Sequence, residues 1–173
     1  MRTFIRTVSI CAFALAVLPF SVRAEHVRVT NPNAVSVEAL GRGLLYSVDY
    51  DRVVSDDIVV GVGIGSTSMR TLGDVDAGIS TALIPIYANL YLIRDGNSPF
   101  VTAGADIVTN SGQLAGLKST FGGMEFNSNA VLPTFGVGFE ARTDAGFMAR
   151  LTAYGVIAKG FNPWGGLTLG YSF

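Results

Sequence analysis

The sequence predicts an all-β protein, an antiparallel transmembrane up-and-down β-barrel of about eight strands. Three observations predict this fold class. Apolar residues alternate with small or polar ones along several segments, as in strands with one face in lipid. The chain is apolar, with a mean hydropathy of +0.44 and 14% charged residues, yet no apolar run after residue 24 is long enough for a transmembrane helix. Short and long connections also alternate between the segments.

The first 24 residues have the pattern of a cleaved signal peptide. Two arginines precede an apolar run that is about half the length a membrane-spanning helix needs. Val22 and Ala24 occupy the minus-three and minus-one positions of a small-residue cleavage site. We therefore expect residues 1–24 to be a signal peptide and residues 25–173 to be a single outer-membrane β-barrel domain. An uncleaved anchor and a lipoprotein attached at Cys11 are the weaker interpretations.

Charge and cysteine content exclude several classes of protein. The chain has 13 acidic and 12 basic residues, and three of the basic ones lie in the predicted signal peptide. The mature chain is therefore mildly acidic, which argues against nucleic acid as a partner. The single cysteine also lies in the leader, so no disulfide can stabilise the exported domain.

Alternation with a period of two marks seven segments as strands. In residues 57–67, Ile58, Val60, Val62 and Ile64 alternate with valine, glycine and threonine. In the predicted hairpins, every charged side chain falls on the face without the aliphatic residues. The seven predicted strands are 35–50, 57–67, 83–94, 99–109, 134–142, 147–154 and 164–173.

The segment 35–50 does not keep one phase. Glu38 has the same parity as the apolar end of the segment, which includes Tyr46, so the whole segment cannot face lipid in one register. Gly41 and Gly43 lie between the two parts and could host a β-bulge that shifts the phase by one residue. We predict a kink at these glycines.

The strand count leaves one strand to be found, because closed single-chain bacterial barrels have even numbers of strands. Residues 25–34 could supply a short first strand. Part of residues 113–129 is the other candidate. We expect eight strands in total.

The lengths of the connections predict the topology. Short connections lie near residues 51–56, 95–98 and 143–146, and longer ones near 68–82 and 111–129. Outer-membrane barrels have short periplasmic turns and longer extracellular loops. The two long connections and the turn at residues 159–163 are therefore predicted to be extracellular.

Inward-facing glycines are predicted to make room for large polar side chains in a filled lumen. Charged groups in such an interior need partners, because their desolvation is costly. We therefore expect an ion-pair network of Glu140, Arg142, Arg150 and Asp106, extending to Glu38 and Arg42, with a structural and not a catalytic role. The predicted inward glycines are at positions 61, 63, 65, 104, 136, 138, 166 and 170, and the large inward side chains are Tyr87, Tyr91, Arg142, Arg150 and Tyr154.

Aromatic residues lie near the predicted strand ends, where rings favour the level of the lipid headgroups. They are Tyr46, Tyr50, Phe100, Phe147, Phe161, Trp164, Tyr171 and Phe173. The alternative is a soluble β-sandwich that buries these rings and the aliphatic residues in its core.

The C-terminal segment, residues 164–173, favours the membrane interpretation. It ends in Phe173, with Tyr171 two residues earlier and aliphatic residues at alternate positions. This pattern resembles the terminal strand of bacterial outer-membrane proteins. The resemblance implies that the barrel-assembly machinery recognises this strand and is a partner of the chain.

A second resemblance covers most of the mature chain. Residues 38–52, Ile84-Pro85-Ile86 and residues 162–167 are similar to a family of uncharacterised bacterial outer-membrane β-barrel proteins of the small, eight-stranded type. The resemblance implies a fold and a location in the cell outer membrane, but no activity. The family's Ser-x-Asn-Tyr motif has Asp49 in place of asparagine in this chain.

No catalytic, cofactor-binding or metal-binding residue is predicted, so we expect that the protein is not an enzyme. His26 is the single histidine and the second residue of the mature chain, a poor place for a catalytic base. Asp74 and Asp76 could bind calcium weakly, but a solvated loop explains them better. The Gly61-x-Gly63-x-Gly65 pattern is similar to a phosphate-binding fingerprint but lies inside a strand with no helix after it.

Three classes of function remain. The leading one is a monomeric outer-membrane barrel with a structural or surface-interaction role, its partners being the bilayer and the assembly machinery. A small-solute channel or lipid-handling barrel is the second, and its lumen would have to accommodate large inward side chains. A soluble periplasmic lipid-binding β-barrel is the third.

Overall fold

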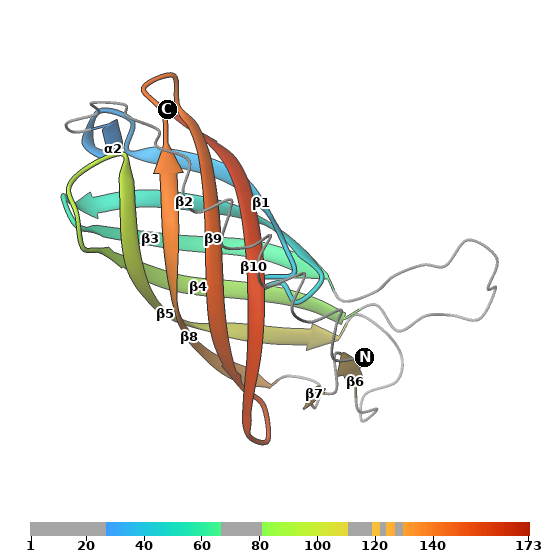
Figure 1. Ribbon diagram of the computed structural model, residues 1–173. Helices are drawn as coiled ribbons and strands as arrows, with labels where there is room; N and C mark the ends of the chain where they lie inside the picture. Colours follow the sequence, from blue (N-terminus) through green and yellow to red (C-terminus); the bar gives the residue numbers. More distant parts are fainter. Residues whose placement is uncertain (1–26, 67–80, 111–118, 122–123, 127–129) are drawn as a thin grey trace, which may run out of the picture.

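The computed structural model describes residues 27–66, 81–110, 119–121, 124–126 and 130–173. Eight strands close into an antiparallel barrel in the order β1-β10-β9-β8-β5-β4-β3-β2 (Figure 1). Neighbouring strands follow one another along the chain, and β1 pairs with β10 to close the sheet. The predicted all-β fold with eight antiparallel strands is confirmed. The strands are β1 (Asn33–Ala39), β2 (Tyr46–Ser55), β3 (Ile58–Ser66), β4 (Thr81–Tyr91), β5 (Asn97–Asn110), β8 (Val131–Arg142), β9 (Phe147–Ile157) and β10 (Phe161–Ser172).

The prediction of a single kinked strand over residues 35–50 is wrong, because these residues belong to the hairpin formed by β1 and β2. Ala39 pairs with Tyr46, and the chain reverses direction between them. Leu40 and Leu44 both have φ near 62°, in the left-handed region, which sets the sharp turn. The phase change seen in the sequence is real, but a reversal of the chain produces it instead of a bulge.

Splitting this segment supplies the eighth strand, so both predicted sources of it are wrong. Within residues 25–34, Val27–Thr30 form the helical turn α2, and β1 begins only at Asn33. Within residues 113–129, Ser119–Phe121 (β6) and Met124–Phe126 (β7) pair with each other in a separate two-stranded sheet. No helix among the described residues is long and apolar enough to cross a membrane.

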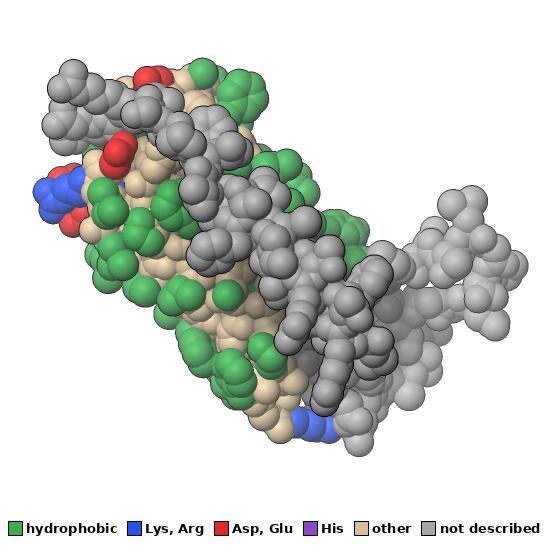
Figure 2. Space-filling model, viewed as in Figure 1, with side chains coloured by type: hydrophobic (Ala, Val, Ile, Leu, Met, Phe, Trp, Pro, Cys, Tyr) green, Lys and Arg blue, Asp and Glu red, His purple; other side chains and the backbone are tan. Residues whose placement is uncertain are grey.

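The outward faces of the strands are apolar. Val60, Leu90, Val137 and Leu169 each expose between 40% and 60% of their surface. On the face shown in Figure 2, hydrophobic side chains cover the middle of the wall, and charged side chains lie toward its two ends. The buried charged side chains lie at inward positions. The barrel is therefore polar inside and apolar outside, the reverse of a soluble barrel with an apolar core.

The connections separate into two ends of the barrel, as their lengths predicted. At the terminal end, β1 begins and β10 ends, together with the turns between β2 and β3, β4 and β5, and β8 and β9. At the loop end lie the turn of residues 40–45, the turn of residues 158–160 and the connections after β3 and β5. Most residues of the last two connections, like the predicted signal peptide, lie outside the described residues.

Inward glycines make room for large side chains, as predicted. A Cβ on Gly61 would lie 2.3 Å from the Tyr87 ring, and one on Gly138 would lie 2.4 Å from the Phe100 ring. Such distances are far shorter than a van der Waals contact. Residues larger than glycine at these positions would push aromatic rings out of the lumen.

Two of the predicted interfacial aromatic residues point inward instead. Phe100 is only 2% exposed and packs against Tyr91, with ring centroids 5.4 Å apart. Trp164 is partly buried against the apolar residues that fill the loop end. Phe100 fits inside because its partner across the sheet is Gly138. The other six are exposed on the outer wall: Tyr46, Tyr50, Phe147, Phe161, Tyr171 and Phe173.

Candidate functional site

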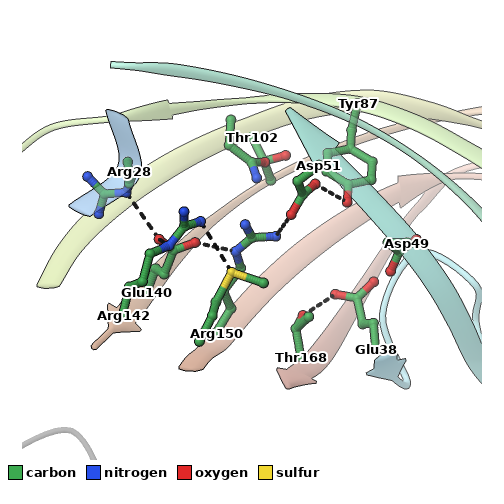
Figure 3. A network of polar contacts seen from close by, with 12 residues as sticks. Arg28, Glu38, Asp49, Asp51, Tyr87, Thr102, Glu140, Arg142, Arg150 and Thr168 are labelled. Carbon is green, nitrogen blue, oxygen red and sulfur yellow. Dashed lines mark hydrogen bonds and ion pairs between the residues drawn. The ribbon is translucent and has the colours of Figure 1, made fainter. Parts of the chain in front are cut away.

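The terminal end of the lumen holds a carboxylate shared by three guanidinium groups (Figure 3). Glu140 Oε1 accepts hydrogen bonds from Arg28 Nε at 3.1 Å and from Arg142 Nε at 3.2 Å. Its Oε2 accepts from Arg150 Nε and from the Tyr91 hydroxyl, both at 2.5 Å. Glu140 is fully buried, and the three arginines are at most 4% exposed. Burial of so many charges is tolerable only because each finds an opposite partner.

Asp51 extends this cluster toward the middle of the lumen. Its Oδ2 lies 2.6 Å from Arg150 Nη1, and its Oδ1 accepts a hydrogen bond from the Tyr87 hydroxyl at 2.6 Å. We call Glu140, Asp51, Arg28, Arg142 and Arg150 the terminal-end cluster. It contains three cations and two anions.

Arg28 belongs to α2 and not to the barrel wall. Its guanidinium lies 3.9 Å from the centre of the Tyr91 ring, and its Nη1 donates to the Ile93 carbonyl at 3.2 Å. Val27 of the same helical turn is also buried. The segment before β1 therefore folds over the terminal end and places one cation inside it.

A second group of charges lies nearer the loop end. Glu38 accepts hydrogen bonds from the Tyr154 hydroxyl at 2.7 Å, the Thr168 hydroxyl at 3.2 Å and the Arg42 backbone N–H at 2.8 Å. The Arg42 side chain donates to Asn89 at 3.2 Å and to Thr102 at 2.5 Å, and it lies over the Tyr87 ring at 3.7 Å. Arg42 is therefore held by neutral groups and an aromatic face.

Asp49 and Asp106 are the least satisfied carboxylates of the interior. Asp49 accepts one hydrogen bond, from the Ser47 hydroxyl at 2.9 Å, and its other oxygen has no partner among the described residues. Both carboxylate oxygens of Asp106 lack a hydrogen-bond partner in the same part of the chain. We call Glu38, Asp49, Asp106 and Arg42 the acidic cluster. It contains three carboxyl groups and one guanidinium group.

Apolar side chains close the lumen above the acidic cluster. We call this group the apolar plug; its members are Leu44, Leu83, Val108, Leu132, Val156 and Ala158. Leu44 comes from the turn between β1 and β2, which folds into the lumen, and it is fully buried. The plug separates the charged interior from the loop end.

The predicted ion-pair network is partly confirmed. Glu140, Arg142 and Arg150 form it as expected, and Glu38 and Arg42 are joined through a backbone N–H. Asp106 was also predicted to be a member, but its carboxyl group makes no hydrogen bond or ion pair within the described part of the chain. Its neighbours on the two adjacent strands are Pro85 on β4 and Leu132 on β8, and neither side chain can donate a hydrogen bond.

Three members of the interior were missed in the sequence. Asp51 was placed in a turn because β2 was read as ending at residue 50, whereas β2 runs to Ser55. Continuing the alternation of β2 by one step would have found it. Arg28 was placed on a candidate strand, and no signal in the sequence shows that α2 folds over the barrel end. Asp49 was recognised as an added charge, and its inward position follows from its parity with Ser47.

The described residues offer no metal-binding group of three or more histidine, cysteine or acidic side chains. Gly61, Gly63 and Gly65 lie within β3, where the sites of their missing side chains point at Tyr87, Asp49 and Ser47. They serve packing, as the sequence indicated. His26, Asp74 and Asp76 lie outside the described residues. The predictions that the chain has no catalytic, cofactor or metal site stay predictions.

Fold and interior together define a small up-and-down β-barrel with an apolar outer wall and a filled, charged lumen. The N-terminal β-barrel domain of Pseudomonas aeruginosa OprF is similar in structure, with a TM-score of 0.57 and 18% sequence identity. The similarity covers 82% of this chain and 98% of that domain. At this identity it shows the fold alone. No known family model matches the chain, and no curated protein sequence matches it.

Proposed function

We propose that the mature chain is a small integral protein of the bacterial outer membrane with a structural or surface-interaction role, and that it is not an enzyme. The observation that carries this proposal is the polarity of the wall. Among the described residues, nine charged side chains are buried inside, and the outer strand faces are apolar. A barrel with this arrangement is stable in a bilayer, where backbone groups must pair internally and outward residues contact acyl chains.

The strand lengths and the exposed aromatic residues support a location in the membrane. A tilted strand crosses the hydrocarbon core in about 9–11 residues, and most strands of the barrel lie close to this range. Tyr50 and Tyr171 are exposed near the terminal end, and Phe161 near the loop end. Such rings at the two edges of an apolar belt fit the headgroup levels.

An arginine scan along β8 tests the proposal. Val137 and Val131 are equally exposed, at 60%, but Val137 lies in the middle of the strand and Val131 at its start. In a bilayer, Val137→Arg should lower the free energy of unfolding by about 2–4 kcal/mol and Val131→Arg by about 1 or less. The measurement is urea unfolding of the barrel in phospholipid vesicles. If both variants unfold like the wild type, the outer wall is in water and the proposal is wrong.

Gel migration provides an independent check of the same proposal. Folded outer-membrane barrels resist detergent and migrate differently before and after heating. We expect the chain to require detergent for extraction and to show such a shift. Recovery of the protein in the soluble fraction, without a shift, would support a periplasmic lipid-binding barrel. The buried charges argue against that alternative, because an apolar ligand needs an apolar lumen.

A channel is the second candidate, because barrels of the same architecture can enclose pores. The filled lumen argues against it. Tyr87, Tyr91, Arg142, Arg150 and Tyr154 point inward and are each at most 4% exposed, and the apolar plug covers them at the loop end. We expect no steady conductance in planar bilayers. Regular single-channel steps would favour the channel.

The remaining parts of the proposal concern partners. The C-terminal strand, with Tyr171 and Phe173 exposed on the outer wall, is proposed as the segment that the barrel-assembly machinery recognises. The connections after β3 and β5 are proposed to face the cell exterior and to carry surface interactions. The protein is proposed to act as a monomer. Deletion of Phe173 should reduce assembly into the membrane in cells more than refolding into vesicles.

A further inference from the structure

Arg52 is the one charged side chain that a barrel strand directs outward, within the described part of the chain. The other charged residues of the eight barrel strands are buried in the lumen, whereas Arg52 is exposed. On the outer face it pairs across the sheet with Asn33 on β1 and with Val60 on β3. An arginine on an apolar wall costs free energy unless it reaches water or an anion. The charge of Arg52 therefore needs a partner outside the barrel wall.

The side-chain amide of Asn33 lies beside Arg52. Asn33 exchanges its backbone hydrogen bonds with Phe173, so Asn33 and Arg52 form a cross-strand pair without backbone bonds between them. Side chains approach most closely in such pairs. The Tyr50 hydroxyl donates to Asn33 Oδ1 at 2.7 Å, while Asn33 Nδ2 makes no hydrogen bond within the described residues. Arg52 and Asn33 together present several hydrogen-bond donors and one positive charge.

No carboxylate of the described residues occupies Arg52. Its guanidinium makes no hydrogen bond or ion pair in this part of the chain. Asp51, the preceding residue, is buried in the lumen on the other side of the wall. Asp56 and Asp57, in the turn after β2, both pair with Arg94. The guanidinium of Arg52 is therefore available to an anion from outside the chain.

Arg52 and Asn33 lie near the terminal end of the apolar wall. Asn33 is the first residue of β1, and Arg52 is its partner on β2. Val35 on β1 pairs with both Tyr50 and Tyr171, so two exposed tyrosines lie across this part of the wall. Tyrosine rings favour the headgroup level of a bilayer. From this position the long arginine side chain can extend its guanidinium to the headgroups.

We propose that Arg52 and Asn33 bind the phosphate group of a phospholipid in the membrane leaflet at the terminal end, an assignment that rests on the proposed membrane function. A guanidinium matches the geometry of a phosphate and can donate two parallel hydrogen bonds to its oxygens. Asn33 Nδ2 supplies a further donor beside it. Acyl chains can contact any part of the apolar wall, whereas this pair of residues selects a headgroup at one position. Free phosphate has the same chemistry without the chains, so the experiment compares both.

The experiment titrates the whole mature protein, folded in dodecyl maltoside, with dioleoyl phosphatidylglycerol and counts the bound lipids by native mass spectrometry. The detergent contains no phosphate that could compete. We expect one phosphatidylglycerol to bind more tightly than further copies. Dioleoylglycerol has the same chains without phosphate, and inorganic phosphate has no chains, so each should bind more weakly by about tenfold or more. Equally tight binding of either probe would overturn the assignment to a phospholipid phosphate.

Two variants test the two donors. Arg52→Gln removes the charge and should weaken binding of the first phosphatidylglycerol by about tenfold. Asn33→Asp keeps the acceptor for the Tyr50 hydroxyl and places a carboxylate beside Arg52. This carboxylate should occupy the guanidinium and repel phosphate, so lipid binding should fall although Arg52 is present. Neither side chain is buried, so both variants should fold.

Arg94→Gln is the matched control. Arg94 lies at the same end of the barrel and the variant loses the same charge, but its guanidinium is already paired with Asp56 and Asp57. It should bind phosphatidylglycerol like the wild type. Equal weakening by Arg94→Gln and Arg52→Gln would reduce the effect to general charge and overturn the site. Unchanged binding by Arg52→Gln would overturn it too.

Heat-modifiable migration of each sample separates failure of the site from failure of the proposed function. A shifted band without a tightly bound phosphatidylglycerol contradicts the phosphate site alone. Absence of the shift in every sample contradicts a folded membrane barrel, and with it both proposals.

Discussion

The two charged clusters of the lumen differ in how well their charges are matched. In the terminal-end cluster, both oxygens of Glu140 are occupied and Asp51 is paired with Arg150. In the acidic cluster, Asp49 and Asp106 have oxygens without partners among the described residues, and Arg42 is the one cation. The clusters lie in the same barrel and are buried to a similar degree.

This difference shows that burial alone does not determine how much a charged side chain contributes to the stability of the fold. Removing one partner of a buried ion pair destabilises the fold strongly, because the other charge then stays buried without compensation. The terminal-end cluster should therefore be sensitive to single substitutions. The acidic cluster should tolerate loss of a carboxylate and be sensitive to loss of its cation.

The largest expected effect is that of Glu140→Gln. The amide keeps the shape but removes the charge that faces Arg28, Arg142 and Arg150. We expect the free energy of unfolding to fall by about 3–5 kcal/mol. Urea unfolding in detergent micelles, followed by Trp164 emission, measures it. A loss below about 1 kcal/mol, the range of exposed ion pairs, would mean that the three arginines do not depend on Glu140.

Arg42→Met should have the next largest effect. Methionine can still pack over Tyr87, but it cannot donate to Asn89 and Thr102 or offset the three carboxylates. We expect a loss of about 2–3 kcal/mol from these charged hydrogen bonds in the same unfolding experiment. The contact from residue 42 to Glu38 should survive, because a backbone N–H makes it. A variant as stable as the wild type would show that the acidic cluster does not need its cation.

Asp106→Asn should act in the opposite direction. It replaces a buried carboxyl group whose oxygens have no hydrogen-bond partner in the described part of the chain. We expect unchanged stability or a gain of about 1 kcal/mol, since desolvation of the carboxylate no longer opposes folding. The matched comparison is Glu140→Gln, also a carboxylate-to-amide change. Similar losses in both variants would erase the distinction between the two clusters.

The smallest effect is expected outside the lumen, at Asp57 in the turn after β2. Arg94 Nε and Nη2 donate to its two oxygens at 2.9 Å each, which lowers the pKa of Asp57 below its ordinary value of 3.8. A lowered pKa gives stability that is present above the ordinary value and lost as the pH falls through the lowered one. Both side chains are in contact with solvent. Asp57→Asn should leave the unfolding midpoint unchanged at pH 7, and a clear shift there would contradict this.

Much of the barrel could be predicted from the sequence, because alternation reports directly on a wall with two different faces. It located β3, β4, β5, β8, β9 and β10 and the direction of their side chains. It failed for β1 and β2, because the reversal between them is short and its two glycines, Gly41 and Gly43, were assigned to a bulge within one strand instead of a turn. Leu40, Leu44 and Leu45 made an inward-folded turn look like the middle of a strand.

The site was predicted where its residues lie on regular strands. Glu140, Arg142 and Arg150 keep the phase of β8 and β9, and their convergence follows from the pairing of Glu140 with Arg150. The contribution of Arg28 depends on α2 packing over the barrel end, a contact with β8 far along the chain. Asp106 was wrongly assigned to the network because parity places a side chain inside but says nothing about its distance from a partner.

The seam between β1 and β10 has a consequence for the order of assembly. It joins the first and last strands through six paired positions, whereas β9 and β10 share eleven. Joining segments that are distant in the chain has an entropic cost, and the short seam between β1 and β10 offers few contacts to offset it. We expect the sheet to form as an open, curved ribbon that closes last at this edge. Pulse-labelled hydrogen exchange should then protect the amides of Val37 later than those of Leu151, and simultaneous protection would contradict it.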